Sequence, residues 1–315
     1  MFTLLNKILN YRPQKLIKNL GKTAVPSLFI LGQIPVFPAR NYSNFADWCL
    51  NYSRLESDIR NTVKVLVNKG LEENNPESWQ EIVDTDGCFA VEKTLSSKES
   101  LSFEPDDSIT NLAPIATLKN LKELNLDRQM IDDINPLSTL SQLEKLNLSR
   151  NLIYETTPLG SLKELRELDL SYNPTYFLAP LSSLKKLEKL NIERASVSNI
   201  EALNPLIGLK RLKLGGNRIN DVQPLSSLYN LEKLDLSGNV IRDISSLASL
   251  DGIIELKVEN NYIPPEAQIC PVEQAIACRD LFNQRTANYS VEEIDIFQRQ
   301  RRILERNRRI LRQLR

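Results

Sequence analysis

The sequence of 315 residues contains no histidine. This absence removes the commonest general base, the Ser–His and Cys–His nucleophile pairs, and zinc sites that use imidazole ligands. Only ten glycines are present, and the pair Gly215 and Gly216 does not belong to a phosphate loop of the GxxxxGK type. We therefore expect no catalytic centre, no cofactor and no metal site, and we predict that the protein is not an enzyme.

A long apolar run is also missing near the N-terminus. The charge-free run at residues 23–39 holds 17 residues, which is short of the roughly 20 that span a bilayer. It follows five basic residues and ends in Pro38 and Ala39, a pattern typical of a signal peptide. We predict that residues 1–40 are a signal peptide or targeting segment, with an uncleaved anchor or a basic tail as the alternatives.

Net charge is absent as well, because 40 Lys and Arg balance 40 Asp and Glu, but the charges are distributed unevenly. Residues 1–40 hold six basic and no acidic side chains, and residues 285–315 hold nine Arg against four acids. Residues 41–108 hold 14 acids against six bases, whereas residues 109–263 are nearly neutral. Nucleic-acid binding by residues 109–263 is therefore disfavoured, since phosphate neutralisation needs a basic surface.

What the sequence does contain is a strict repeat. Seven segments follow the pattern Leu-x-x-Leu-x-Leu at a spacing of 22 residues, with Ile or Val in a few apolar positions. Their first residues are Leu121, Leu143, Leu165, Leu187, Leu209, Leu231 and Ile253. A period without insertions indicates one supersecondary unit stacked on copies of itself, because a unit of this size cannot bury its apolar face alone.

Each repeat has two halves. Leu146 and Leu148 alternate with polar residues, and this period of two predicts a short strand with one buried face. The return half, as in residues 131–140, combines Pro136 with tight apolar spacing, which favours a short 3₁₀ turn over a full helix.

Between the halves, an Asn recurs where a side-chain amide can satisfy backbone groups at the turn. Two repeats have Gln129 and Ala195 at this place, so we expect the row of amides to be interrupted there. The structural Asn residues are Asn151, Asn173, Asn217, Asn239 and Asn261.

These residues resemble the leucine-rich repeat family, in particular the 22-residue class of internalins and of a phosphatase regulator. The resemblance covers residues 109–263. It implies an α/β repeat solenoid, a right-handed horseshoe with parallel strands inside and short 3₁₀ turns outside. It also implies no enzymatic activity, and binding of a protein or peptide partner on the concave face.

Four cysteines lie outside the repeats, two before and two after them. Solenoid ends leave a layer of leucines uncovered, and small caps gain stability from a disulfide. The surrounding segments are similar to the caps of bacterial secreted leucine-rich repeat proteins, which makes all four disulfide candidates. Four reduced thiols in a cytosolic protein are the alternative, and a four-cysteine zinc site is disfavoured by the separation of the pairs. The candidates are Cys49, Cys88, Cys270 and Cys278.

We predict that residues 41–108 form a mainly helical N-terminal cap. Residues 57–70 have apolar side chains at helical spacing and end at Gly70. Leu101 and Phe103 are expected to start an irregular strand beside the first repeat. Residues 264–284 are the predicted C-terminal cap.

Two sets of residues are candidates for contact with a partner. Charges at the second and third repeat positions mostly alternate in sign between neighbours, which predicts a mutually neutralising ladder or, alternatively, a recognition surface. The eighth positions would then form a cationic and aromatic strip. Tyr176 and Phe177 replace the usual turn residues of one repeat and are either exposed contacts or packing residues. The strip consists of Arg128, Arg150, Tyr172 and Arg194.

The basic segment 285–315 has its own pattern. Ser290 and Glu293 form a capping box, and the unit Arg-Arg-Ile-Leu at residues 301–304 recurs at 308–311. Residues 290–315 are therefore interpreted as an amphipathic helix that binds a coiled-coil partner or an anionic membrane surface. The alternative is a solvated or folded-back tail.

Taken together, these features favour a non-catalytic interaction protein that is exported, periplasmic or secreted. The alternative is a cytosolic scaffold or regulator of the phosphatase-regulator kind.

Overall fold

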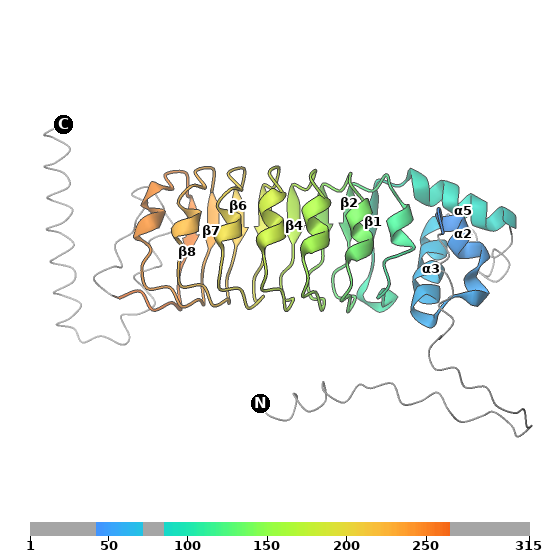
Figure 1. Cartoon of the computed structure of the whole chain (residues 1–315), viewed down its shortest axis with the longest axis horizontal. Helices are drawn as coiled ribbons and strands as arrows, with labels where there is room; N and C mark the ends of the chain where they lie inside the picture. The colour runs from blue at the N-terminus through green and yellow to red at the C-terminus, as the bar shows by residue number, and fades with distance from the viewer. Residues whose placement is uncertain (1–41, 72–84, 265–315) are drawn as a thin grey trace, which may run out of the picture. The chain divides into compact units, whose positions relative to one another are not determined.

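The computed structural model describes residues 42–71 and 85–264, and Figure 1 shows their arrangement. Helices at the N-terminal side precede an eight-stranded parallel sheet in which each strand pairs with the next one in sequence. The predicted signal peptide 1–40, the basic segment 285–315, Cys270 and Cys278 lie outside the described residues. So does the predicted C-terminal cap 264–284, apart from its first residue.

The helices are α2 (Phe45–Leu50), α3 (Ser57–Gly70) and α5 (Thr85–Ser97), and the 3₁₀ turn η1 (Tyr52–Arg54) follows α2. The Asn44 side chain caps α2 by accepting a hydrogen bond from the Asp47 amide at 2.9 Å, which satisfies a free donor of the first turn. The end of α3 at Gly70 agrees with the sequence. The prediction of a helical N-terminal cap is confirmed.

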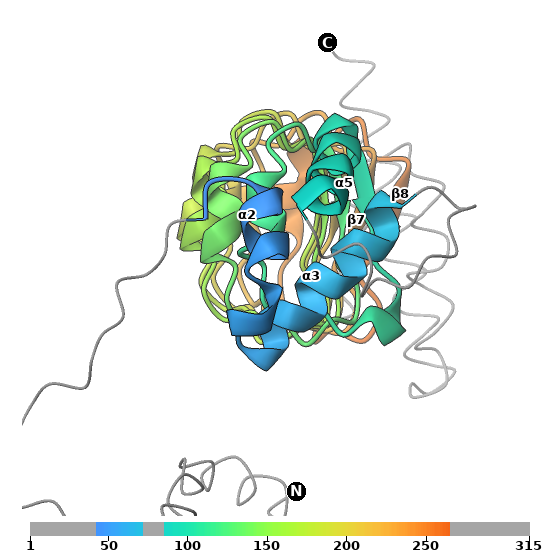
Figure 2. The same cartoon turned by 90° about the vertical axis from the view of Figure 1, so that its right-hand side faces the viewer.

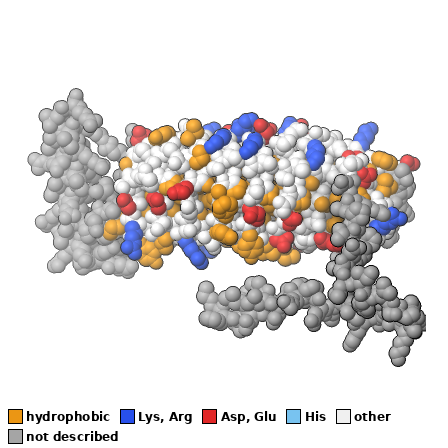
Figure 3. Space-filling view, in the orientation of Figure 1, with side chains coloured by type: hydrophobic (Ala, Val, Ile, Leu, Met, Phe, Trp, Pro, Cys, Tyr) orange, Lys and Arg blue, Asp and Glu red, His pale blue; other side chains and the backbone are white. Residues whose placement is uncertain are grey.

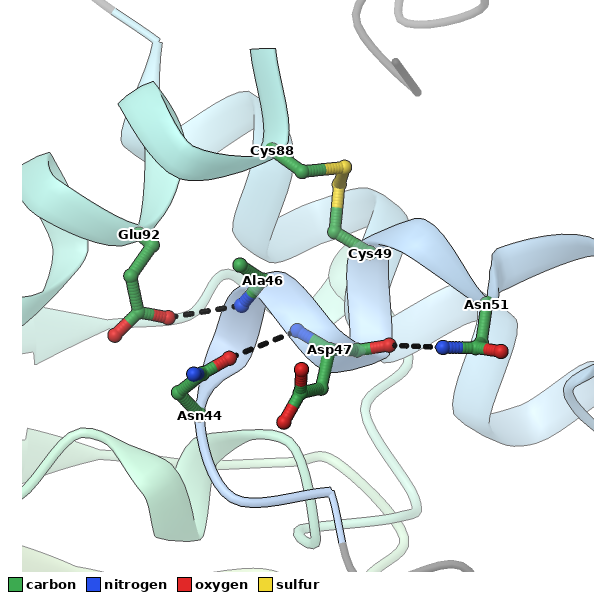
Figure 4. Close-up of a disulfide and its surroundings, with 7 residues drawn as sticks. All are labelled: Asn44, Ala46, Asp47, Cys49, Asn51, Cys88 and Glu92. Atoms are coloured by element: carbon green, nitrogen blue, oxygen red, sulfur yellow. Dashed lines mark hydrogen bonds between the residues drawn. A yellow bond between two sulfur atoms is a disulfide. The ribbon is translucent and has the colours of Figure 1, made fainter. Parts of the chain in front are cut away.

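A disulfide between Cys49 and Cys88 joins α2 to α5 (Figure 4). Both cysteines are fully buried. Beside the disulfide, the Glu92 carboxylate accepts a hydrogen bond from the Ala46 amide at 2.9 Å, so a first-turn donor of α2 is satisfied from α5. The bridge links residues 39 positions apart, and in the chain-entropy account a loop of this size contributes roughly 4 kcal/mol. One predicted cysteine pair is thus a disulfide.

Helices α3 and α5 pack closely at Gly70. A Cβ atom at this position would lie 2.6 Å from Cγ1 of Val91, well inside van der Waals contact. The glycine that ends α3 therefore also permits the close approach of α5.

The strands of the repeats are short, and each has a buried residue between two more exposed ones. In register, Leu124 faces Leu146 and Leu146 faces Leu168, so equivalent leucines form one row in the core. The strands are β1 (Ser100–Ser102), β2 (Glu123–Asn125), β3 (Lys145–Asn147), β4 (Glu167–Asp169), β5 (Lys189–Asn191), β6 (Arg211–Lys213), β7 (Lys233–Asp235) and β8 (Glu255–Lys257).

Short 3₁₀ turns cover the other face, and in Figure 1 they lie in front of the strands. Four of the turns on this face have Pro at their own first or second helical position, where the missing N–H costs nothing. The predicted solenoid of parallel strands and 3₁₀ turns is confirmed. The turns on this face are η3 (Ile115–Thr117), η4 (Asn135–Thr139), η5 (Thr157–Ser161), η6 (Ala179–Ser183), η7 (Glu201–Leu203), η8 (Gln223–Leu225) and η9 (Ser245–Ser249), and a separate 3₁₀ turn, η2 (Pro105–Asp107), follows β1 directly.

The recurring Asn residues hold neighbouring coils together. Asn217 illustrates the arrangement: its Oδ1 accepts hydrogen bonds from the amides of Ala195 and Val197, both at 3.0 Å. Its Nδ2 donates to the carbonyls of Ile192 at 2.7 Å and Leu214 at 2.9 Å. Each amide therefore satisfies buried backbone groups of its own coil and of the preceding one. Asn151, Asn173, Asn239 and Asn261 are bonded in the same manner.

The expected interruption at Gln129 was wrong. Its longer side chain accepts from the Ile109 amide at 2.8 Å and donates to the Glu104 carbonyl at 2.7 Å, so it performs the role of the Asn. Only Ala195 supplies no amide. After both residues the backbone departs from the pattern, because Met130 and Ser196 adopt a left-handed φ of 59° and 65°.

The helices cover the first coil of the solenoid (Figure 2). The Thr62 hydroxyl donates to the Asn111 carbonyl at 2.9 Å, and the Asn61 amide donates to the Asp107 carbonyl at 2.8 Å. Leu101 and Phe103 are buried beside the repeats, as expected, and belong to the same hydrophobic core as the helices. The cap therefore removes the first layer of leucines from water.

Candidate partner-binding surface

The side of the sheet that faces solvent is the predicted concave side, and it forms a shallow groove. The groove has a volume of about 560 Å³ and is lined by residues of β1 to β6, from Ser100 to Lys213. At each strand the first and third residues face this groove and the central Leu points into the core. The groove is thus surfaced by polar and charged side chains on a rigid sheet.

Ion pairs between neighbouring coils neutralise part of the groove. The alternating charges meet as the sequence predicted: Lys145 pairs with Glu123 at 2.6 Å, and Lys189 with Glu167 at 2.7 Å. Further pairs join neighbouring coils outside the residues that line the groove: Lys122–Glu99, Arg166–Glu188, Lys210–Glu188 and Lys233–Glu255. Such exposed pairs contribute little stability each, but they neutralise the surface.

The ladder shifts the pKa values of its members in the expected directions. Hydrogen bonds from Lys210 and Arg166 lower the pKa of Glu188, and a hydrogen bond to Glu123 raises the pKa of Lys145. Both groups therefore stay charged near neutral pH.

Arg211 departs from this neutralisation. Its neighbours in the row, Lys189 and Lys233, pair with Glu167 and Glu255 on the sides away from it. Within residues 42–71 and 85–264, no carboxylate forms an ion pair with Arg211. The groove therefore carries an uncompensated cation on β6.

The predicted strip lies at the turn that follows each strand. All four residues adopt a left-handed backbone, with φ of 59° at Arg128, 56° at Arg150 and Tyr172, and 53° at Arg194. The equivalent positions in the next two coils are Gly216 and Gly238. A left-handed conformation costs a residue with a side chain roughly 1–2 kcal/mol. Four consecutive coils thus keep long side chains where glycine fits with less strain.

Contacts between the side chains bring the strip together. The guanidinium carbons of Arg150 and Arg194 lie 5.2 Å and 5.6 Å from the ring centre of Tyr172, on either side along the stack. Such contacts stabilise by about 0.5–1 kcal/mol at exposed sites. Arg128 and Arg150 also pair with Asp127, at 3.4 Å and 3.3 Å.

Arg194 ends the strip and differs from the other two arginines. In the part of the chain that the structure describes, it forms no ion pair with a carboxylate. The Cγ of Arg194 lies against the next coil, where a Cβ atom at Gly216 would approach it to 2.9 Å. Gly216 thus provides the space that Arg194 occupies.

Tyr176 and Phe177 lie apart from the strip in the chain, in the loop between β4 and η6. Both are exposed, with 65% and 49% of their surface accessible, so they are not core packing residues. The sequence did not reveal how this loop is held, because its two supporting threonines, Thr156 and Thr175, occupy core positions of the repeat.

The described residues contain no group of three or more His, Cys, Asp or Glu side chains placed to hold a metal ion. Within the same ranges, no helix is long and apolar enough to cross a membrane.

Comparison with known proteins agrees with this architecture. A family model described as leucine-rich repeats (2 copies) matches residues 207–249. No curated protein matches the chain in sequence. A leucine-rich repeat protein of Leptospira interrogans has 23% identity and a TM-score of 0.50 over 61% of this chain and 49% of its own, which supports the fold alone.

Two solved internalins of Listeria monocytogenes are more similar. Internalin inlF has 27% identity and a TM-score of 0.54, and the match covers 56% of this chain and 52% of that one, about half its length. Internalin C2 (inlC2) has 31% identity and a TM-score of 0.56, with coverage of 59% of this chain and 80% of that one. This extent of identity and coverage shows that the chain belongs to the leucine-rich repeat proteins of the internalin-like class.

Proposed function

We propose that the protein is an interaction module that binds a protein or peptide partner on the concave face, with the strip as its main contact. Leucine-rich repeat proteins generally mediate protein–protein interactions, and their fold is typically a non-catalytic scaffold. The observation that carries the proposal is the left-handed backbone of Arg128, Arg150, Tyr172 and Arg194. A strained conformation retained in four adjacent coils is expected where the side chains serve binding.

The charges indicate the chemistry of the partner. Most cations of the groove are neutralised between coils, whereas Arg194 and Arg211 lie on the adjoining coils of β5 and β6 without an ion pair among the described residues. Tyr172 adds a half-exposed aromatic ring beside Arg194. Arg and Tyr are enriched at binding hot spots. A partner that presents carboxylates and a flat apolar or aromatic group fits this arrangement.

Export is the second part of the proposal. The buried Cys49–Cys88 disulfide supports an oxidising compartment, since such bonds are rare in the cytosol of mesophiles. A cytosolic scaffold of the phosphatase-regulator kind is the alternative. Intact mass in the native host, after alkylation with and without prior reduction, separates them. Cleavage near residue 39 with protected thiols supports export, and a full-length chain with free thiols contradicts it.

The surface is tested by photo-crosslinking in the native host. A photoreactive phenylalanine analogue replaces Tyr172 in one variant and Tyr229 in a matched control, because Tyr229 is also exposed but lies outside the groove and the strip. We expect a discrete adduct from position 172 that is lost when Arg194→Glu is added, and none from position 229. Adducts of equal yield from both positions, or an adduct insensitive to Arg194→Glu, would contradict the proposal.

A further inference from the structure

A second exposed surface lies where the coils turn from the strand towards the 3₁₀ turn. We call it the loop edge and define it by residues 130–135, 152–157, 174–179, 196–201, 218–223 and 240–245. Over the coils of β2 to β4 it carries five large apolar side chains that are each at least 49% exposed. Figure 3 shows hydrophobic side chains gathered near the middle of one face of the repeats, with acidic ones beside them. The five are Met130, Leu152, Tyr154, Tyr176 and Phe177.

The spacing of the coils places these side chains next to one another. Equivalent positions of neighbouring coils lie about 4.8 Å apart, because the strands of these coils are hydrogen-bonded in register. Leu152 therefore follows Met130 along the stack, and Tyr176 follows Tyr154. Contiguous exposed apolar surface of this kind marks an interaction site more often than scattered residues do.

Phe177 occupies a position that has a structural role in other coils. There, a polar side chain accepts a hydrogen bond from the backbone amide two residues later, for example Asp133 from Asn135 at 2.9 Å. Phenylalanine cannot accept such a bond, so this coil gives up the capping interaction and exposes an aromatic ring. The capping residues are Asp133, Glu155, Asn199, Asp221 and Asp243.

Two buried threonines hold the patch in place. The Thr156 hydroxyl donates to the Phe177 carbonyl at 2.7 Å, and the Thr175 hydroxyl donates to the Ile153 carbonyl at 2.7 Å. Both threonines are fully buried, at positions that are Ile or Val in most other coils. The hydrogen bonds tie the loop of Tyr176 and Phe177 to the preceding coil, and such rigid presentation lowers the entropic cost of binding.

The loop edge is acidic. It holds six acids and two bases in all, and over the coils of β2 to β4 three acids and no base. Hydrogen bonds from Thr157 lower the pKa of Glu155, and those from Ser245 lower the pKa of Asp243, so both stay ionised near neutral pH. The acids are Asp132, Asp133, Glu155, Glu201, Asp221 and Asp243, and the bases are Arg218 and Arg242.

We propose that the C-terminal segment of this chain, residues 290–315, docks on the loop edge of the same molecule as an amphipathic helix. Its sequence supplies what the surface lacks: it holds eight Arg and four acids, with Ile and Leu pairs at 303–304 and 310–311. Seven helical residues rise about 10.5 Å, and two coils advance about 9.6 Å. The apolar pairs of a helix along the stack thus recur once every two coils, and its arginines meet the carboxylates.

The length of chain permits this docking. The described solenoid ends at residue 264, and 31 residues separate it from Ile296 at the start of the apolar pattern. Such a segment reaches up to about 100 Å when extended, whereas the coil of β4 lies about 19 Å from that of β8 along the stack. The N-terminal cap is acidic too, but within residues 42–71 and 85–97 its large exposed apolar side chains are limited to Leu50 and Phe89. The loop edge is therefore the better site.

Hydrogen exchange of the full-length, disulfide-bonded protein tests the docking. The variant Tyr176→Ser/Phe177→Asp is compared with the wild type and with Tyr229→Ser, which alters an exposed tyrosine outside the loop edge. The variant uses residue types found at the same positions of other coils, such as Ser198 and Asp133, so the solenoid is expected to fold. We expect amides of residues 290–315 to exchange at least tenfold faster in the variant than in the wild type or the control.

The outcomes are distinct. Equal exchange of residues 290–315 in all three proteins overturns the proposal, whether these amides are protected elsewhere or not at all. Protection that appears only as the protein concentration rises assigns the segment to a second copy and overturns docking within one molecule. Protection that is independent of concentration and is weakened by 1 M NaCl supports it, because salt screens the arginine–carboxylate attraction.

Discussion

Replacing Asn217 by alanine is predicted to destabilise the solenoid strongly. The substitution removes the acceptor of the Ala195 and Val197 amides and a donor to the Ile192 carbonyl, all in the core. The Leu214 carbonyl keeps a partner, since Asn239 also donates to it at 3.0 Å. Three buried groups therefore lose a hydrogen bond, at a cost of about 1 kcal/mol or more each. We expect a loss of roughly 3 kcal/mol in the free energy of unfolding.

Equilibrium urea denaturation followed by circular dichroism measures this loss. The matched control is Asn220→Ala, because Asn220 is an exposed amide in the same coil and is expected to change stability by less than about 0.5 kcal/mol. If Asn217→Ala shifted the transition no further than Asn220→Ala, the row of amides would not hold the coils together and the reasoning would be refuted.

Three other predictions concern stability. Gly70→Ala should destabilise the cap by about 1–3 kcal/mol, because the new Cβ would clash with Val91, and a calorimetric scan measures the shift. Arg128→Asn should leave stability equal or raise it by up to about 1 kcal/mol in denaturant unfolding, since Asn tolerates the left-handed backbone; a marked loss would contradict the assigned strain. Asp243→Ala should destabilise the protein at neutral pH but not in acid. The pKa of Asp243 in the folded protein lies below its ordinary 3.8, so the stability that this carboxylate contributes is fully present above pH 3.8. This stability is lost as the pH falls through the folded pKa. Denaturation at pH 7 and pH 2.5 measures the difference.

The repeat architecture follows from the sequence because its signal is redundant. A leucine that recurs every 22 residues leaves one face of each unit unburied, and only stacking in register buries it. The charge ladder was predictable for the same reason, since register alone places Lys145 beside Glu123. Gln129 was misjudged because the sequence does not show how far a longer amide can reach.

The candidate surfaces depend on features that a single sequence hides. The sequence does not show that Arg150 and Tyr172 adopt a left-handed backbone. The structure shows this strain, because Gly216 and Gly238 hold the same structural position in later coils. In the sequence Arg211 looks like its basic neighbours Lys189 and Lys233. Only the structure shows that these two lysines have carboxylate partners and that Arg211 has none among the described residues. These properties arise from pairing across coils, which residue types alone do not specify.

The affinity of the partner recovered by crosslinking tests the central claim most directly. Its dissociation constant is measured for the wild type, Tyr172→Ala, Arg194→Glu and the control Tyr229→Ser, at low and physiological salt. We predict at least a tenfold loss for each of the two strip variants, a weaker salt dependence for Arg194→Glu, and no change for Tyr229→Ser. Equal affinities for all four proteins would show that the partner does not bind at the strip.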